Sequence, residues 1–210
     1  MKKSFLFSLV ISAFCFTANA QTNVYHPFPD SNAVWNEYTG TNSGYGYYIE
    51  SIIGDTIINS IKYHKVYKHT ESLTPSDTII TISNSWFIGA IREDSLKRIY
   101  FYNKYAVPCC GKTDSTYLLY DFSKHVGDTV FFSNNFQYGY TYPYLIVNSI
   151  DSILAYNQYR KRFNLNGETW IEGIGSTRSL FSAILGIPTC FCTNELVCYK
   201  YRDTSYYLNP

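Results

Sequence analysis

The sequence has 210 residues, a formal net charge of +1 and 46% hydrophobic residues. This near-neutral balance offers no electrostatic footprint for nucleic acid, which normally binds a clustered basic face. After the first 20 residues, no apolar run reaches the length needed to span a bilayer.

The first 20 residues have the pattern of a secretory signal peptide. Lys2 and Lys3 give a positive start, and residues 5–16 form an apolar run that is too short to be a membrane span. An Ala-Asn-Ala cleavage site follows at 18–20, so the mature chain is expected to begin at Gln21.

A lipid anchor on Cys15 is the weaker alternative, because Phe14 stands where lipidation needs a small residue. We therefore expect a secreted or periplasmic protein in an oxidising compartment. Residues 21–210 contain no linker-like stretch and are interpreted as a single β-rich domain.

The rest of the chain, with 22 Tyr and 14 Phe, is typical of β-strands. A short helix is at most expected near the mature N-terminus, from Ser31 to Tyr38, with Asp30 or Ser31 as its cap. Further on, aromatic and aliphatic runs are separated by turn-forming residues. The predicted strands are residues 61–69, 85–91, 97–103, 115–122, 128–132, 142–150, 159–166 and 195–201.

An Asp followed by Thr or Ser and an aliphatic residue recurs between these runs, at Asp55, Asp77, Asp94, Asp128 and Asp151. Asp bonds to nearby backbone and starts turns, so these sites are interpreted as hairpin corners. Calcium binding is the weaker alternative, because no calcium-loop motif is present. The pattern predicts an all-β antiparallel meander that closes as a β-sandwich or barrel.

Four phrases carry a resemblance to a family. They are GDTIINSIKYHKVYK (54–68), IGAIREDSLKRIYFYN (88–103), LLYDFSKHVGDTVFF (118–132) and WIEGIGS (170–176). Together they resemble uncharacterised secreted β-rich proteins of Bacteroidetes-type bacteria, over roughly residues 34–201. Many relatives carry a C-terminal sorting domain for type IX secretion, and this sequence shows none. The resemblance implies no catalytic residues.

No catalytic, metal or cofactor motif is recognised. The four histidines lack zinc-ligand spacing, and the glycines at 173 and 175 lack the setting of a nucleophile elbow or a dinucleotide site. Glu168 and Glu172 would lie about 13 Å apart on one strand. Glycosidase carboxylates lie about 5 to 9.5 Å apart, so these two do not make that pair.

Tyrosines supply the best candidate for a ligand surface. Tyr138, Tyr140, Tyr142 and Tyr144 alternate, so an extended chain would place all four rings on one face. Such a face could stack on sugar rings or on a protein partner, or it could simply cover the core. Residues 45, 47 and 48, all tyrosines, offer a weaker second platform.

These observations favour a non-catalytic extracytoplasmic β-domain that serves as a surface or binding module for a glycan or a protein. The alternative is a secreted hydrolase of extracellular polymers, such as a glycosidase, with carboxylates that converge from separate strands.

The remaining cysteines are interpreted as disulfide-forming, in preference to a metal or redox site. A turn at residues 193–195 would set Cys190 opposite Cys198. Cys192 could then reach Cys109 or Cys110, which are adjacent and therefore poorly placed to bond to each other.

Overall fold

The computed structural model describes residues 24–41, 44–71, 82–104, 114–132, 144–155, 157–182, 193–202 and 204–208. Strands make up most of these residues, which confirms the predicted all-β class. A short 3-10 helix, η2, covers Ile82–Asn84. Within the described ranges, no helix has the length and apolar character needed to cross a membrane.

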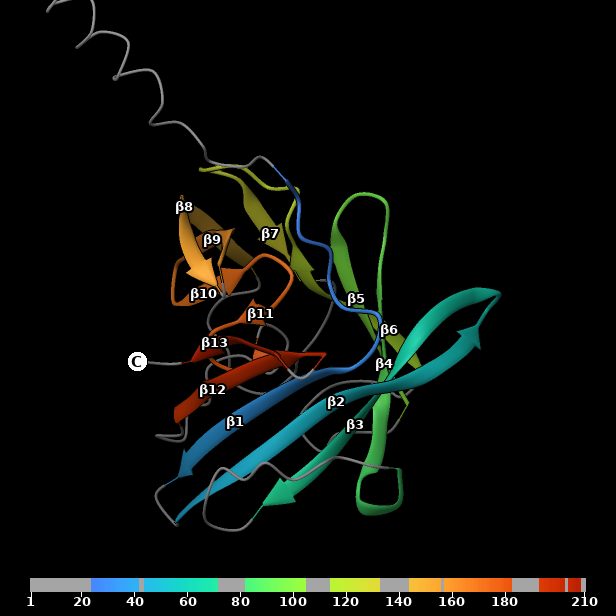
Figure 1. Ribbon diagram of the computed structural model, residues 1–210. Helices are drawn as coiled ribbons and strands as arrows, with labels where there is room; N and C mark the ends of the chain where they lie inside the picture. The colour runs from blue at the N-terminus through green and yellow to red at the C-terminus, as the bar shows by residue number, and fades with distance from the viewer. Residues whose placement is uncertain are drawn as a thin grey trace, which may run out of the picture.

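Eight antiparallel strands form the larger sheet, in the order β13-β12-β1-β2-β3-β4-β5-β6 (Figure 1). The first six strands of the chain lie side by side in sequence order, so the predicted meander is confirmed for them. The last two strands extend the sheet at the β1 edge. The bounds are β1 Ala33–Thr41, β2 Gly44–Ile58, β3 Ile61–Glu71, β4 Trp86–Glu93, β5 Arg98–Asn103, β6 Ser115–Asp121, β12 Thr193–Tyr201 and β13 Thr204–Leu208.

Five strands form the smaller sheet, in the order β11-β10-β9-β8-β7. The two curled sheets pack against each other, with the small sheet over one end of the large one (Figure 1). The bounds are β7 Thr129–Phe131, β8 Tyr144–Ala155, β9 Gln158–Leu165, β10 Glu168–Ile171 and β11 Gly175–Ser176.

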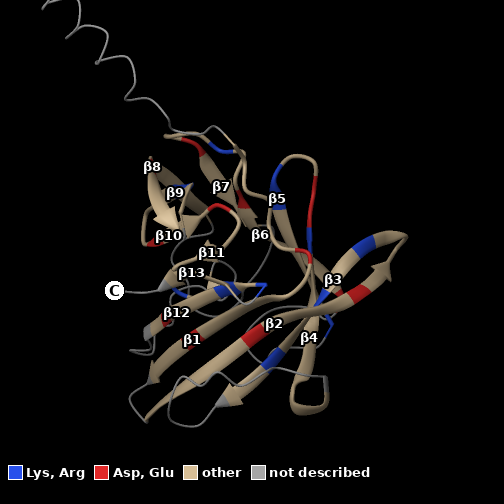
Figure 2. Cartoon of the chain, viewed as in Figure 1, with Lys and Arg blue, Asp and Glu red and all other residues tan. Residues whose placement is uncertain are grey.

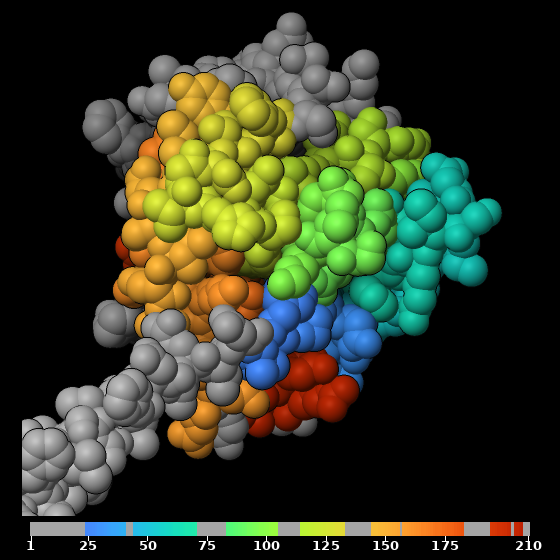
Figure 3. Space-filling model, turned by 90° about the horizontal axis from the view of Figure 1, so that it is seen from above, coloured from blue at the N-terminus to red at the C-terminus, as the bar shows by residue number. Residues whose placement is uncertain are grey.

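The β2–β3 hairpin projects from the body (Figure 1), beside the β4–β5 segment (Figure 3). Its turn consists of Asn59 and Ser60, with φ of 49° and 64°. Positive φ at both central residues gives the primed turn whose twist matches the strands. The predicted corner at Asp55 is wrong, because Asp55 lies within β2 beside a register shift.

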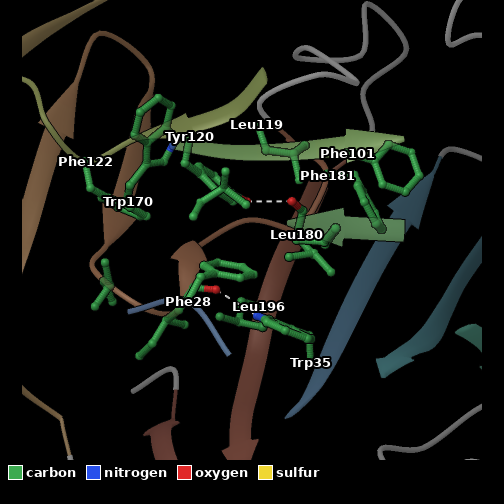
Figure 4. Close-up of a cluster of buried hydrophobic side chains, with 14 of the residues drawn as sticks. Phe28, Trp35, Phe101, Leu119, Tyr120, Phe122, Trp170, Leu180, Phe181 and Leu196 are labelled. Carbon is green, nitrogen blue, oxygen red and sulfur yellow. Dashed lines mark hydrogen bonds between the residues drawn. The ribbon is translucent and has the colours of Figure 1, made fainter. Parts of the chain in front are cut away.

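The core lies between the sheets and is rich in aromatic rings (Figure 4). Trp35 of β1 and Trp170 of β10 are fully buried. Phe28 stacks on Trp35 with ring centroids 5.8 Å apart, and Tyr120 of β6 meets Trp170 edge-on at 5.2 Å. These rings join the two sheets into one hydrophobic core.

Two of these rings have their buried polar atoms paired with backbone carbonyls, as burial favours, whereas the Trp170 indole nitrogen has no hydrogen-bond partner within the described residues. The Trp35 indole N–H donates to the Ile174 carbonyl at 2.8 Å, and the Tyr120 hydroxyl donates to the Leu180 carbonyl at 2.6 Å (Figure 4). Ile174 lies between β10 and β11 of the small sheet and Leu180 follows β11, so these bonds also connect the sheets.

The segment before β1 is fastened to both sheets. The Tyr25 hydroxyl and the Phe28 N–H donate to the Glu93 carboxylate at the end of β4, the latter at 2.8 Å. The His26 N–H donates to Glu172, which follows β10, at 3.3 Å.

The predicted short helix from Ser31 to Tyr38 is wrong. β1 begins at Ala33, and β12 and β2 pair with it on either side. Its backbone groups therefore bond to neighbouring strands, and this pairing, together with burial of Trp35, outweighs the local cap signal.

Candidate functional site

Three tyrosines gather at the end of the β1–β2 hairpin. Tyr38 lies opposite Tyr47, with ring centroids 5.4 Å apart, and Tyr45 lies 6.3 Å from Tyr38. Alternate residues of a strand share a face, so Tyr45 and Tyr47 project on the same side. Tyr45 is 59% exposed. Tyr38, Tyr45 and Tyr47 are called the tyrosine cluster below.

The cluster has the chemistry of a binding surface. Its rings are tilted by 58° and 31° to Tyr38, so the surface is ridged rather than flat. Aromatic faces pack on apolar faces of a partner. Glu195 of β12 lies opposite Tyr38 and is exposed, so its carboxylate can accept hydrogen bonds from hydroxyl or N–H groups.

The second platform expected from the sequence is partly wrong. Tyr48 lies on the opposite face from Tyr47, and the Lys68 ammonium is 3.9 Å from its ring centroid. Tyr38, and not Tyr48, is the third member of the cluster. In a hairpin centred between residues 42 and 43, Tyr38 pairs with Tyr47. Placing the turn at that point in the sequence would have identified Tyr38 as a neighbour of Tyr47.

The sequence predicts a strip of four alternating tyrosines, Tyr138, Tyr140, Tyr142 and Tyr144. The first three of them lie outside the described residues. Tyr144 begins β8, and its ring centroid is 6.1 Å from that of Phe131 in β7. Phe131 is 69% exposed, so an apolar pair projects at this edge of the small sheet. The strip itself stays a prediction.

Three charged residues on neighbouring strands meet in the interior. Glu37, Glu50 and Lys68, from β1, β2 and β3, are called the buried acid cluster. Lys68 Nζ lies 2.8 Å from Glu50 Oε1, and the Leu180 N–H donates to Glu37 Oε1 at 2.5 Å. Glu50 is fully buried and Glu37 nearly so. Sequence reasoning missed this cluster.

Burial raises the pKa of Glu37 well above its ordinary value, and the charge of the hydrogen-bonded Glu50 raises it further. Burial opposes the charged form of Lys68, but the two carboxylates outweigh it, so the pKa of Lys68 is raised. Glu50 Oε2 is buried and accepts no bond within the described residues. The raised pKa of Glu37 favours its protonated form, whose O–H could act as a donor to Glu50.

This geometry differs from that of a glycosidase. Glu37 and Glu50 are in direct hydrogen-bond contact, whereas glycosidase carboxylates are separated by about 5 to 9.5 Å so that substrate or water fits between them. Both side chains are also shielded from solvent. The cluster combines a carboxyl of raised pKa with a buried ion pair, and it presents no carboxylate to a polymer.

The two glutamates that the sequence placed near each other have separate partners. Glu168 accepts hydrogen bonds from Ser176 and, at 2.5 Å, from Ser182. Glu172 instead accepts the His26 N–H. Burial raises the pKa of both carboxyls. They act as separate buried anchors with different partners, and the separation expected from the sequence stays a prediction.

The expected turn at residues 193–195 is wrong, because these residues begin β12 and pair with β1. The geometric reason for setting Cys190 opposite Cys198 is thereby lost. Cys198 is a free, buried thiol, and the Asn36 amide nitrogen lies 3.0 Å from its sulfur. Cys190 itself lies outside the described residues.

The other cysteines, Cys109, Cys110 and Cys192, also lie outside the described residues, so the pairing of Cys192 with one of the other two stays a prediction. Among the side chains that the structure describes, no group of three His, Cys, Asp or Glu could hold a metal ion.

Comparison with protein-family models, curated proteins and solved structures finds no match to this chain. The resemblance to secreted proteins of Bacteroidetes-type bacteria therefore stays a prediction.

Proposed function

We propose that this protein is a non-catalytic, exported β-domain that binds a glycan or a protein through the tyrosine cluster. The observation that carries the proposal is the grouping of three tyrosine rings from two strands, with the exposed Glu195 carboxylate beside them. Export rests on the signal-peptide pattern of the first 20 residues.

The alternative of a secreted glycosidase has less support. It requires two accessible carboxylates with room for substrate between them. Glu37 and Glu50, which converge from separate strands, are buried and in contact with each other. A binding role needs only the exposed rings.

The purified protein should be tested on a glycan array of plant, host and bacterial glycans, and a hit should then be measured by calorimetry. Tyr45→Ala should weaken binding by about fivefold to tenfold, because one stacked ring is removed. The melting temperature should change little, since Tyr45 is 59% exposed. Tyr159→Ala is the matched control, because Tyr159 is 53% exposed on the small sheet.

An equal loss of binding in both variants would contradict a local site at the cluster. No hit on the array would remove the glycan version of the proposal and leave the protein version. A large fall in the melting temperature of Tyr45→Ala would show that the ring serves the core instead.

A further inference from the structure

A second surface combines a fixed guanidinium with aromatic rings. Arg92 of β4 lies opposite Tyr100 of β5, and its Cζ is 4.4 Å from the Tyr100 ring centroid. On its other side the Arg92 Nε–H donates to the Tyr63 hydroxyl at 3.1 Å, with Cζ 5.5 Å from the Tyr63 ring centroid. Tyr63, Arg92 and Tyr100 are called the arginine–tyrosine ladder below.

Some of the described cations on this face of the sheet form ion pairs with carboxylates, and others do not. Arg98 stacks on Tyr100 at 5.6 Å and makes an ion pair of 2.7 Å with Asp94. Arg92 and Lys65 have no carboxylate within ion-pair distance among the residues that the structure describes. Both are only half-buried. Lys, Arg, Asp and Glu are spread over many strands and turns of the described chain (Figure 2).

Lys65 belongs to the same face as the ladder. It lies opposite Ala90, two residues before Arg92 on β4, and it is two residues from Tyr63 on β3. Alternate residues share a face, so the two unpaired cations are diagonal neighbours across adjacent strands.

The described acidic residues near the ladder interact with other groups and not with Arg92 or Lys65. Asp121, which also influences Tyr100, accepts hydrogen bonds from Ser123 and lies 3.8 Å from Lys124. Glu93, next to Arg92 in the chain, faces the N-terminal segment and accepts the Tyr25 hydroxyl. The ladder therefore keeps an uncompensated positive charge.

We propose that the ladder binds the carboxylate of an acidic sugar unit in a polysaccharide. A guanidinium is a planar fork that matches a carboxylate, and stacking between two tyrosines restrains Arg92 before the ligand arrives. Tyr102, whose ring centroid is 6.3 Å from that of Tyr63, is partly exposed and offers a face for the sugar ring.

Single-stranded nucleic acid would also bring anions and rings, but it normally follows a continuous basic groove. Here two unpaired cations stand on a chain of net charge +1. One carboxylate on each sugar ring fits this small site better. The proposal goes beyond the tyrosine cluster, because it concerns other strands and another ligand group.

The test uses the purified full chain, with polygalacturonate as the probe and fully methyl-esterified polygalacturonate as the uncharged match. Binding to the acid form is expected, with little binding to the ester. Arg92→Met should weaken binding about tenfold or more, because a charge-assisted bidentate contact is lost. Arg92→Lys should bind at an intermediate level, since it keeps the charge without the fork.

Lys65→Met should also weaken binding, and Lys62→Met should not. Lys62 lies on the same strand, carries the same charge and is already paired with Asp55 at 2.8 Å. Tyr159→Ala should leave polygalacturonate binding unchanged, because Tyr159 is exposed on the small sheet and belongs to neither site.

Four results would each overturn the proposal: no binding of polygalacturonate, equal binding of the ester, equal losses in Lys62→Met and Lys65→Met, or tighter binding of a single-stranded oligonucleotide. If Arg92→Met does not fold, Arg92→Lys and Lys65→Met still decide the matter.

Discussion

The buried acid cluster makes stability depend on pH in a direction that can be measured. Glu37 has its folded-state pKa raised well above 4.5, first by burial and then by the charge of Glu50. At pH values between the unfolded and folded pKa, the folded protein holds a proton that the unfolded chain has released. The free energy of unfolding should therefore rise as the pH falls from 8 toward 6.

The size of this effect has an upper limit. One proton held only by the folded state contributes about 1.4 kcal/mol per pH unit, so Glu37 adds at most about 3 kcal/mol between pH 8 and pH 6. His26 acts in the opposite sense near its ordinary pKa of 6.5, because burial lowers its folded pKa and stability is lost as the unfolded imidazole becomes protonated.

Glu37→Gln isolates the contribution of Glu37, since His26 is the same in both proteins. The amide can donate to Glu50 while its oxygen accepts the Leu180 N–H, so the bonds of the protonated acid are preserved. Urea unfolding at pH 6, 7 and 8, followed by tryptophan fluorescence, should show a flatter pH dependence and equal or greater stability at pH 8.

Glu195→Gln provides the control, because Glu195 is exposed and should leave the slope unchanged. If the wild-type protein and Glu37→Gln lose stability in parallel between pH 6 and pH 8, Glu37 is not the group that holds the proton.

Three other outcomes test the packing. Lys68→Met should lower the free energy of unfolding by about 3 kcal/mol, because it leaves the Glu50 carboxylate buried without its cation; Lys68→Met combined with Glu50→Gln should recover part of this loss in urea unfolding. Gly173→Ala should destabilise far more than Gly127→Ala. Both glycines have positive φ, but an added Cβ would meet a guanidinium nitrogen at 2.5 Å and a carbonyl oxygen at 2.8 Å at Gly173 and nothing within 4 Å at Gly127; equal melting temperatures would refute the steric reason. Cys198 should react with a thiol reagent only after unfolding, since its side chain is buried; rapid labelling of the native protein would contradict its burial.

The strands were predictable where alternation is local. Residues 61–69 and 97–103 were expected as strands, and the structure has β3 at Ile61–Glu71 and β5 at Arg98–Asn103. β1 was not recognised, because its strand character depends on pairing with β12 and β2. β12 lies far away in the chain, and β2 comes only after β1. A cap signal is local, whereas the pairing that overrides it is not.

The recurring Asp phrase shows the same limit. Asp94 does form a corner: its carboxylate accepts the Leu96 and Arg98 N–H groups at 2.9 and 3.1 Å between β4 and β5. Asp151 instead lies inside β8 and pairs with Arg162 across the strands at 2.6 Å. The same short sequence pattern therefore forms a turn at Asp94 and part of a strand at Asp151, where Arg162 of the neighbouring strand pairs with the carboxylate.

The buried acid cluster could not be read from any single strand. Glu37 alternates with Trp35, so the pattern of β1 places both on one face, yet a carboxylate on a core face is expected only when a partner neutralises it. That partner, Lys68, enters from β3 and reaches Glu37 through Glu50. The three side chains satisfy one another inside the protein and leave no carboxylate of the cluster for a substrate. In the proposed binding role, recognition of a ligand would therefore fall to outward-facing groups such as the tyrosine cluster, whose rings and neighbouring Glu195 are exposed or half-exposed.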